Sequence, residues 1–300
     1  MTLRLVWNYE GPEREELALS HGWLWHSSLW AEFARSCGSI SRDLAIFDGE
    51  KLLALSPAEQ VGITWAPVVR RDLSDRMRAK IWTTCLRERK TVVTLSPLVP
   101  NYSDVILDFL STALRLGWSD QSLTSTVLDP WRPEEQLFSD MAGRHRTAIS
   151  NASEVQMRIR PVKHRDFELF RKLYRDAAGD KGRTDEALNV IRDWPGSHAF
   201  VSAAEQDGEP LSAHLNLLFG RSAYYGFSAN APNAGTASHA LMWETVRWLK
   251  SQGFYKYELG AQYRGVLPYD ESTEKERAIS LFKRGFGGKE VPLIVRSPTT

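Results

Sequence analysis

The residues whose types and spacing best suit chemistry lie near the end of the chain, in the segment Leu281–Gly288 (LFKRGFGG). Lys283 and Arg284 follow the aromatic Phe282 and precede a glycine-rich turn. Positive charge held beside aromatic rings can bind an anion or polarise a carbonyl oxygen. A surface lysine on a final helix that docks onto a sheet has the same local pattern, so spacing alone leaves both interpretations open.

His214 is a second candidate, because it lies in an apolar stretch that is predicted to be a strand. Histidine titrates near neutral pH, so a histidine beside a cleft can act as a general base. A hydrogen-bonded histidine in a sheet core has the same sequence pattern. His26, His145 and His239 do not combine at the spacing of metal ligands, and we therefore predict no metal site.

The composition is typical of a soluble globular protein: 300 residues, 42% hydrophobic, 25% charged and a net charge of +1. Its length allows two ordinary domains. Only Cys37 and Cys85 are present, which favours a reducing, cytoplasmic setting. The start of the chain lacks the apolar core of a signal peptide, and no stretch approaches the ~20 apolar residues of a membrane span. The charge balance excludes a protein that is basic throughout, but it allows a local basic patch.

Helices and strands alternate along the chain and must position these residues. Apolar periodicity and turn residues predict strands at 3–7, 43–47, 51–55, 91–95, 125–128, 155–159, 199–204, 211–219, 222–227 and 254–259. They predict helices at 13–37 (interrupted near His21–Gly22), 74–89, 102–116, 132–150, 167–178, 184–193, 238–250 and 274–283, with Ser238 as the cap of the helix at 238–250. This order predicts an α/β (α+β) protein with domains at 1–140 and 141–300 and an active cleft at or near their interface.

Five segments of the second half resemble, in order, the Fem-like (FemABX-type) branch of the GNAT superfamily of N-acyltransferases. They are Ser125–Ala152, which ends in the pattern R-x-x-I-x-x-A, then Ala223–Ala229 (AYYGFSA), Leu241–Gly253, Tyr257–Ala261 and Ile279–Gly288. His26–Phe33 and Thr64–Val69 resemble the opening helix and first cleft loop of that family. The resemblance implies two GNAT-like domains side by side, the first degenerate, each with a mixed central sheet flanked by helices.

The resemblance also implies an activity. Family members take an aminoacyl group from a charged tRNA, whose acceptor end they grip, and form an amide with an amine of a peptidoglycan precursor or a peptide-like natural product. No bound cofactor is implied. Lys283, with Phe282 beside it, corresponds to the cation at the developing oxyanion, a group that can lower such a barrier by ~3–4 kcal/mol.

The acceptor would be held by further residues, each of which also has an ordinary structural interpretation. Lys181 and Arg183 lie in the loop where the family has a basic residue for a diphosphate. Tyr225 could hold the acceptor by its hydroxyl, and Tyr224, its neighbour on a predicted strand, would then point to the opposite face, so we expect one of the two in the site. The remaining candidates are Tyr263, Arg264 and Trp65.

Two other functions remain open from the sequence. The stretch from Pro232 to Ala237 keeps the Gly-x-Ala of an acyl-CoA pyrophosphate loop at Gly235 and Ala237, but it lacks the leading Arg or Gln. An acyl-CoA-dependent N-acyltransferase acting on a small amine or sugar is therefore an alternative. A non-catalytic binding protein that retains the fold is the other.

Overall fold

The computed structural model describes residues 3–38, 43–57, 63–89, 92–152, 154–179 and 182–298. It divides into two compact units, the first formed by Met1–Thr124 with Pro292–Thr300 and the second by Ser125–Val291. The predicted boundary at 140/141 falls inside the second unit, between helices α5 (Glu134–Ser139) and α6 (Gly143–Ser150). Residues 125–140 belong with the rest of the second unit because α6, which follows them, packs against α9 (Ala237–Ser251) of that unit. In addition, Ala142 N donates to Gly285 O at 2.9 Å.

The first unit contains a four-stranded sheet in the order β1-β2-β3-β5 and a smaller group of strands. The strands of the sheet are β1 (Leu3–Trp7), β2 (Leu44–Asp48), β3 (Lys51–Ser56) and β5 (Val68–Val69). The smaller group is β4 (Ile63–Trp65), β6 (Val92–Leu95), β7 (Ser119–Asp120) and the end of β14 (Lys289–Ser297). The helices are α1 (Glu13–His21), η1 (Leu24–His26), α2 (Ser28–Ser36), α3 (Asp75–Arg87) and α4 (Tyr102–Arg115).

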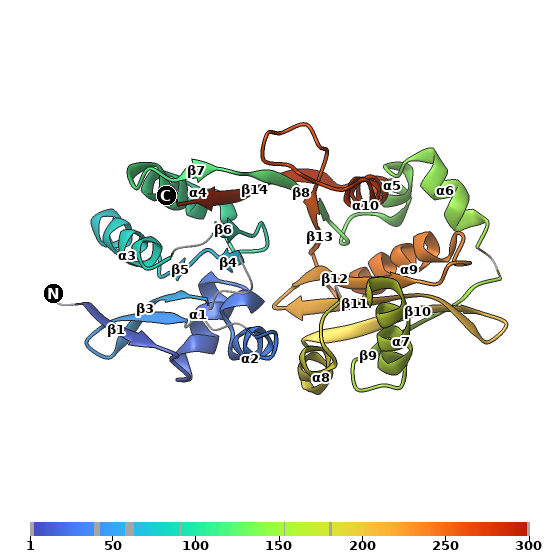
Figure 1. Ribbon diagram of the computed structural model, residues 1–300, viewed down its shortest axis with the longest axis horizontal. Coiled ribbons are helices and arrows are strands. Elements are labelled where there is room, and N and C mark those ends of the chain that lie inside the picture. Colours follow the sequence, from blue (N-terminus) through green and yellow to red (C-terminus); the bar gives the residue numbers. More distant parts are fainter. Residues whose placement is uncertain are drawn as a thin grey trace. The chain divides into compact units, whose positions relative to one another are not determined.

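The second unit, drawn from green to red in Figure 1, has a sheet in the order β8-β13-β12-β11-β10-β9. The strands are β8 (Leu123–Leu128), β9 (Gln156–Pro161), β10 (Ala199–Gln206), β11 (Glu209–Phe219), β12 (Ser222–Asn230) and β13 (Lys256–Gln262). The remaining helices are α7 (Asp166–Ala178), α8 (Asp185–Asp193), α9 (Ala237–Ser251) and α10 (Glu274–Arg284). β12 and β13 are parallel, whereas β9 to β12 are antiparallel. The predicted mixed α/β class is confirmed.

Helices α7 and α9 cover opposite faces of this sheet. Phe200 of β10 contacts Trp248 of α9 with ring centroids 4.4 Å apart. Leu215 of β11 pairs with both Val201, the neighbour of Phe200, and Phe227 of β12, so Phe227 lies on the opposite face from Phe200. Phe227 contacts Tyr174 of α7 with ring centroids 5.8 Å apart. Because adjacent residues of a strand point to opposite faces, the two contacts define two covered faces.

A bulge and a divergence of strands shape the centre of the sheet. Leu215 pairs with Phe227 but Asn216 pairs with Tyr225, so Gly226 is an extra residue in β12. A Cβ atom at Gly226 would lie 3.0 Å from Leu215 O, a close approach that glycine permits. The parallel register of β12 with β13 extends only as far as Tyr224, although both strands continue. The two strands therefore part beyond Tyr224.

Three local predictions were wrong. The helix expected at 132–150 is two helices, because the chain turns at residues 140–142 and Arg146 donates to Ser139 O at 3.0 Å across that turn. Strand β14 was missed, because apolar and polar side chains do not alternate along it. Ser238 is not a cap: Thr236 stands at the start of α9, and Ser238 lies within the helix. No helix among the described residues is long and apolar enough to cross a membrane.

Candidate functional site

Helix α10 carries Lys283 and is fixed at both ends. At its start, Glu276 N donates to Thr273 Oγ1 at 3.2 Å and Thr273 N donates to the Glu276 carboxylate at 2.7 Å, which is a capping box. At its end, His145 Nε2 donates to Phe282 O at 2.9 Å. A helix held in this way presents Lys283 in a defined position.

Lys283 lies where β12 and β13 part. A Cβ atom at Gly260 of β13 would lie 3.2 Å from Tyr224 Oη and 3.3 Å from Lys283 Nζ, so the hydroxyl and the ammonium flank the same bare stretch of backbone. Gly260 has a φ of +84°, a conformation that favours glycine. We call Lys283, Tyr224, Gly260 and the neighbouring Glu258 the lysine site.

Burial lowers the pKa of Lys283 from its ordinary 10.5 to about 8, and the carboxylate of Glu258 partly opposes this lowering. Glu258 is itself buried and accepts a hydrogen bond from Ser125 Oγ at 2.8 Å. Burial, followed by the charge of Glu258, raises the pKa of Tyr224, so its hydroxyl keeps its proton at neutral pH. The site thus holds one cation that loses its proton easily and one hydroxyl donor.

A cavity of about 300 Å³, which we call the α9 cavity, lies on the other side of the sheet. It is bounded by Tyr225 and Ser228 of β12, Gly235, Ser238 and His239 around the start of α9, and Phe282 of α10. Gly235 has a φ of +52°, and Ala237 is the buried first residue of α9. A helix N-terminus that opens on a cavity is a favourable position for an anion.

The predicted site residues are therefore divided between the two sides of β12. Tyr225 borders the α9 cavity, whereas its neighbour Tyr224 belongs to the lysine site, as strand alternation predicts. Phe282 and Lys283 divide in the same way on α10. All four of these residues are candidates from the sequence alone. Gly260, Glu258 and Ser125 are not, because their roles depend on strand register.

His214 does not line the α9 cavity but packs behind two residues that do, Tyr225 and Ser238. Its ring is fully buried, and its Nε2 is 3.4 Å from the Oγ atoms of both Ser212 and Ser238. It packs edge-on against Tyr225 with centroids 5.0 Å apart. Burial lowers the pKa of His214 to about 3, so the ring is neutral at physiological pH.

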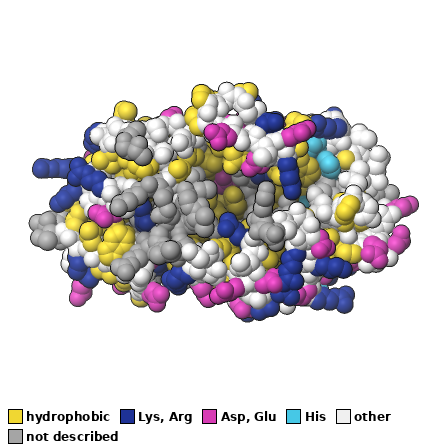
Figure 2. All heavy atoms as spheres, viewed as in Figure 1, with side chains coloured by type: hydrophobic (Ala, Val, Ile, Leu, Met, Phe, Trp, Pro, Cys, Tyr) yellow, Lys and Arg dark blue, Asp and Glu magenta, His cyan; other side chains and the backbone are white. Residues whose placement is uncertain are grey.

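Two further histidines pack behind Phe282, and no spacing in the sequence indicates that they form a pair. The rings of His145 and His239 are 4.6 Å apart, and His239 lies 5.0 Å from the Phe282 ring. Burial lowers the pKa of His145, and it lowers that of His239 to about 4. Figure 2 shows histidine (cyan) toward the right of that view.

Tyr263 lies close enough to the lysine site for its charge to contribute to the raised pKa of Tyr224, whereas Arg264, Arg183 and Trp65 have partners elsewhere. Arg264 forms an ion pair with Glu290, and burial raises the pKa of Tyr263, whose backbone N donates to Ser280 Oγ at 2.9 Å. Arg183 N donates to Tyr174 Oη at 3.2 Å, and Lys181 lies outside the described residues. Trp65 belongs to the first unit, where it stacks on Trp25 with centroids 4.3 Å apart.

Comparison with known proteins identifies the fold to which this arrangement belongs. Residues 139–270 match the model of an acetyltransferase (GNAT) domain. The crystal structure of FemX superposes with a TM-score of 0.69 at 12% identity, covering 100% of this chain and 98% of that one. The chain has a Fem-like GNAT fold. No curated protein matches the sequence significantly.

Two other structures share the Fem-like fold. One is the C-terminal domain (DUF2156) of a candidate lysylphosphatidylglycerol synthetase from Agrobacterium fabrum, with a TM-score of 0.64, 12% identity and coverage of 96% of this chain and 92% of that one. The other is L-PGS from Bacillus licheniformis, with a TM-score of 0.61, 13% identity and coverage of 97% and 92%. At these identities the likeness establishes the fold alone.

Proposed function

We propose that this protein is an acyltransferase that forms an amide between an aminoacyl group carried on tRNA and the amine of an acceptor. The observation that carries the proposal is the Lys283 ammonium beside the Tyr224 hydroxyl, at the point where β12 and β13 part. The Fem-like fold and the acetyltransferase (GNAT) match at residues 139–270 support acyl transfer in general.

In the proposed reaction a neutral amine attacks the ester carbonyl of the donor. A C–N bond forms, the carbonyl oxygen becomes an oxyanion, and the C–O bond to the ribose then breaks. The amine gives up one proton and the ribose oxygen gains one. Lys283, as the ammonium, donates to the developing oxyanion, and Tyr224 is positioned to donate beside it.

The lowered pKa of Lys283 suits this role. With a pKa of about 8, about nine in ten Lys283 side chains are still protonated at pH 7. Partial burial reduces competition from water, so each hydrogen bond to the oxyanion is stronger than it would be on an open surface. The acceptor amine and the rest of the donor would be held by Tyr225, which borders the α9 cavity, and by Arg183, whose backbone N donates to Tyr174 Oη.

The acceptor we propose is an amine of a peptidoglycan precursor or a peptide-like natural product. The charged tRNA need contact the protein only at its acceptor end. On the face in Figure 2, Lys and Arg side chains are interspersed with Asp and Glu, which favours a small contact over an extended one.

One observation favours acyl-CoA as an alternative donor. The α9 cavity opens at the N-terminus of a 15-residue helix and is bounded by Gly235, so backbone N–H groups are near a position suited to a pyrophosphate. The absence of the leading Arg or Gln before Gly235 weakens this alternative.

The experiment that tests the proposal offers the protein both donors. A labelled amino acid mixture on total tRNA and, separately, labelled acetyl-CoA are incubated with cell-wall precursors and short peptides. We expect label to pass from tRNA to an acceptor, and we expect Lys283→Ala to abolish the transfer while Lys289→Ala, an exposed lysine nearby, preserves it. Transfer from acetyl-CoA alone would establish the alternative, and binding of both substrates without transfer would favour a non-catalytic protein.

A further inference from the structure

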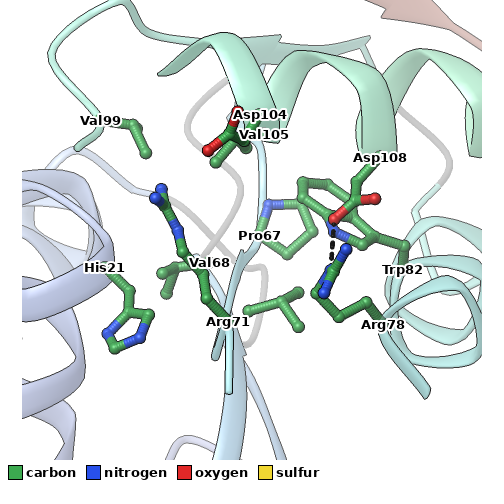
Figure 3. A pocket seen from close by; sticks show the side chains of 11 residues that line it. His21, Pro67, Val68, Arg71, Arg78, Trp82, Val99, Asp104, Val105 and Asp108 are labelled. Carbon is green, nitrogen blue, oxygen red and sulfur yellow. Dashed lines mark hydrogen bonds and ion pairs between the residues drawn. The ribbon is translucent and has the colours of Figure 1, made fainter. Parts of the chain in front are cut away.

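The first unit holds a second cavity, of about 250 Å³, that the proposed function does not use. Figure 3 shows its lining: Arg71 follows β5 and reaches toward α4, Asp104 and Asp108 project from α4, and Arg78 and Trp82 belong to α3. Val68, Val99 and other apolar side chains complete the wall. We call it the α4 cavity.

The α4 cavity occupies a position equivalent to that of the α9 cavity. In the second unit the cavity lies among a strand, the helix that follows it and the helix after the next strand, in the order β12-α9-β13-α10. In the first unit the same order is β5-α3-β6-α4, and the cavity again lies among the first strand and the two helices. The fold thus forms a ligand-sized cavity at the same place in both units.

The charges in the α4 cavity differ from those in the α9 cavity. Arg78 is fully engaged, since it donates to Asp108 at 2.9 Å, to Asp75 at 2.8 Å and to Leu73 O at 3.0 Å. Arg71 donates to Pro100 O, but among the described residues it forms no ion pair with a carboxylate. Asp104, at the mouth, likewise has no ion pair or side-chain hydrogen bond in that part of the chain.

Arg71 and Asp104 are therefore opposite charges that share one cavity without pairing with each other. A partly buried guanidinium without a carboxylate partner has lost water without full compensation, and burial accordingly lowers the pKa of Arg71. A polyphosphate would meet repulsion from Asp104 and Asp108, so a ligand that carries only negative charge is disfavoured.

We propose that the α4 cavity binds a small zwitterion, a free aliphatic α-amino acid, whose carboxylate pairs with Arg71 and whose ammonium pairs with Asp104. Guanidinium and carboxylate match in geometry and can form two parallel hydrogen bonds. The volume is below the ~300–1,000 Å³ of pockets for drug-sized ligands, which fits a molecule of this size. The aliphatic side chain would lie against Trp82, Val68 and Val99, all of which are buried.

Titration calorimetry of the full chain with L-leucine and a set of analogues tests this proposal. We expect L-leucine to bind, and N-acetyl-L-leucine, which lacks the ammonium, and L-leucinamide, which lacks the carboxylate, each to bind at least about tenfold more weakly. Arg71→Met and Asp104→Asn should each weaken L-leucine binding by at least about tenfold. Arg76→Met, which removes an exposed arginine of the same helical region, should leave the affinity unchanged.

The outcomes separate this proposal from the proposed function. L-Leucine binding that survives Lys283→Ala but is lost in Arg71→Met assigns the ligand to the first unit, whether or not any transfer is detected. Equal binding of L-leucine, N-acetyl-L-leucine and inorganic phosphate would overturn the zwitterion in favour of a simple anion site. Failure of L-leucine to bind the wild-type chain, or binding that Arg71→Met and Asp104→Asn leave intact, would overturn the site itself.

Discussion

The buried ammonium of Lys283 should lower the free energy of unfolding, and the size of this effect should depend on pH. A pKa lowered from 10.5 to about 8 means that the folded state disfavours the ammonium by about 3 kcal/mol relative to the unfolded chain. Below pH 8 both states hold the proton and the whole cost is present. As the pH rises from about 8 to 10.5, the folded state releases the proton first, so stability rises relative to a chain without this lysine.

Replacing Lys283 with Met tests this reasoning, because methionine keeps most of the side-chain volume and removes the charge. Urea unfolding at pH 7 should show Lys283→Met to be more stable than the wild type by up to about 3 kcal/mol. The advantage should shrink steadily when the same measurement is repeated up to pH 10. A variant that is less stable at pH 7, or a difference that does not change between pH 7 and pH 10, would refute the claim that the ammonium is desolvated.

Three further substitutions have expected outcomes. Gly285→Ala would place a Cβ atom 2.0 Å from the His145 ring, so overpacking should destabilise the fold by about 1–3 kcal/mol or more in urea unfolding. Gly260→Ala forces a β-carbon onto a φ of +84° and against Lys283, so it should cost about 1–2 kcal/mol of stability and most of the transfer rate. Glu258→Gln removes the charge that raises the pKa of Lys283, so the alkaline limb of the pH–rate profile should move to lower pH.

Two of these predictions have matched controls. Gly208→Ala, at a turn with a φ of +82° where a β-carbon has open space, separates backbone strain from the contact with Lys283 expected at Gly260. Glu271→Gln removes an exposed carboxylate and should leave the pH–rate profile unchanged. An unaltered unfolding midpoint for Gly285→Ala, or an alkaline limb that stays in place for Glu258→Gln, would contradict the geometry described above.

Much of the fold could be predicted from the sequence because the elements of the second unit have strong local signals. Helix α9 has an apolar periodicity and ends just before Gly253, and the turns at Asp207–Gly208 and Gly220–Arg221 separate β10, β11 and β12. The final strand β14 could not be predicted in this way, because it is fixed by pairing with residues far away in the sequence, such as Leu95.

The candidate site was predictable only in part, for a related reason. Lys283, Tyr224 and Tyr225 stand in recognisable motifs, and strand alternation correctly separates the two tyrosines. Gly260 and Glu258 acquire their importance from the parallel register of β12 with β13, which no local pattern specifies. The positions of the residues could be anticipated, but their neighbours could not.

Single-turnover transfer from labelled aminoacyl-tRNA to an acceptor amine, measured for the wild type and for Lys283→Ala, decides whether Lys283 acts in the chemical step. We expect the rate to fall by about 10²–10³-fold, the usual effect of removing one oxyanion donor, while donor binding is retained and the unfolding midpoint does not fall. A Lys283→Ala variant that transfers at the wild-type rate would contradict the assignment of chemistry to the lysine site.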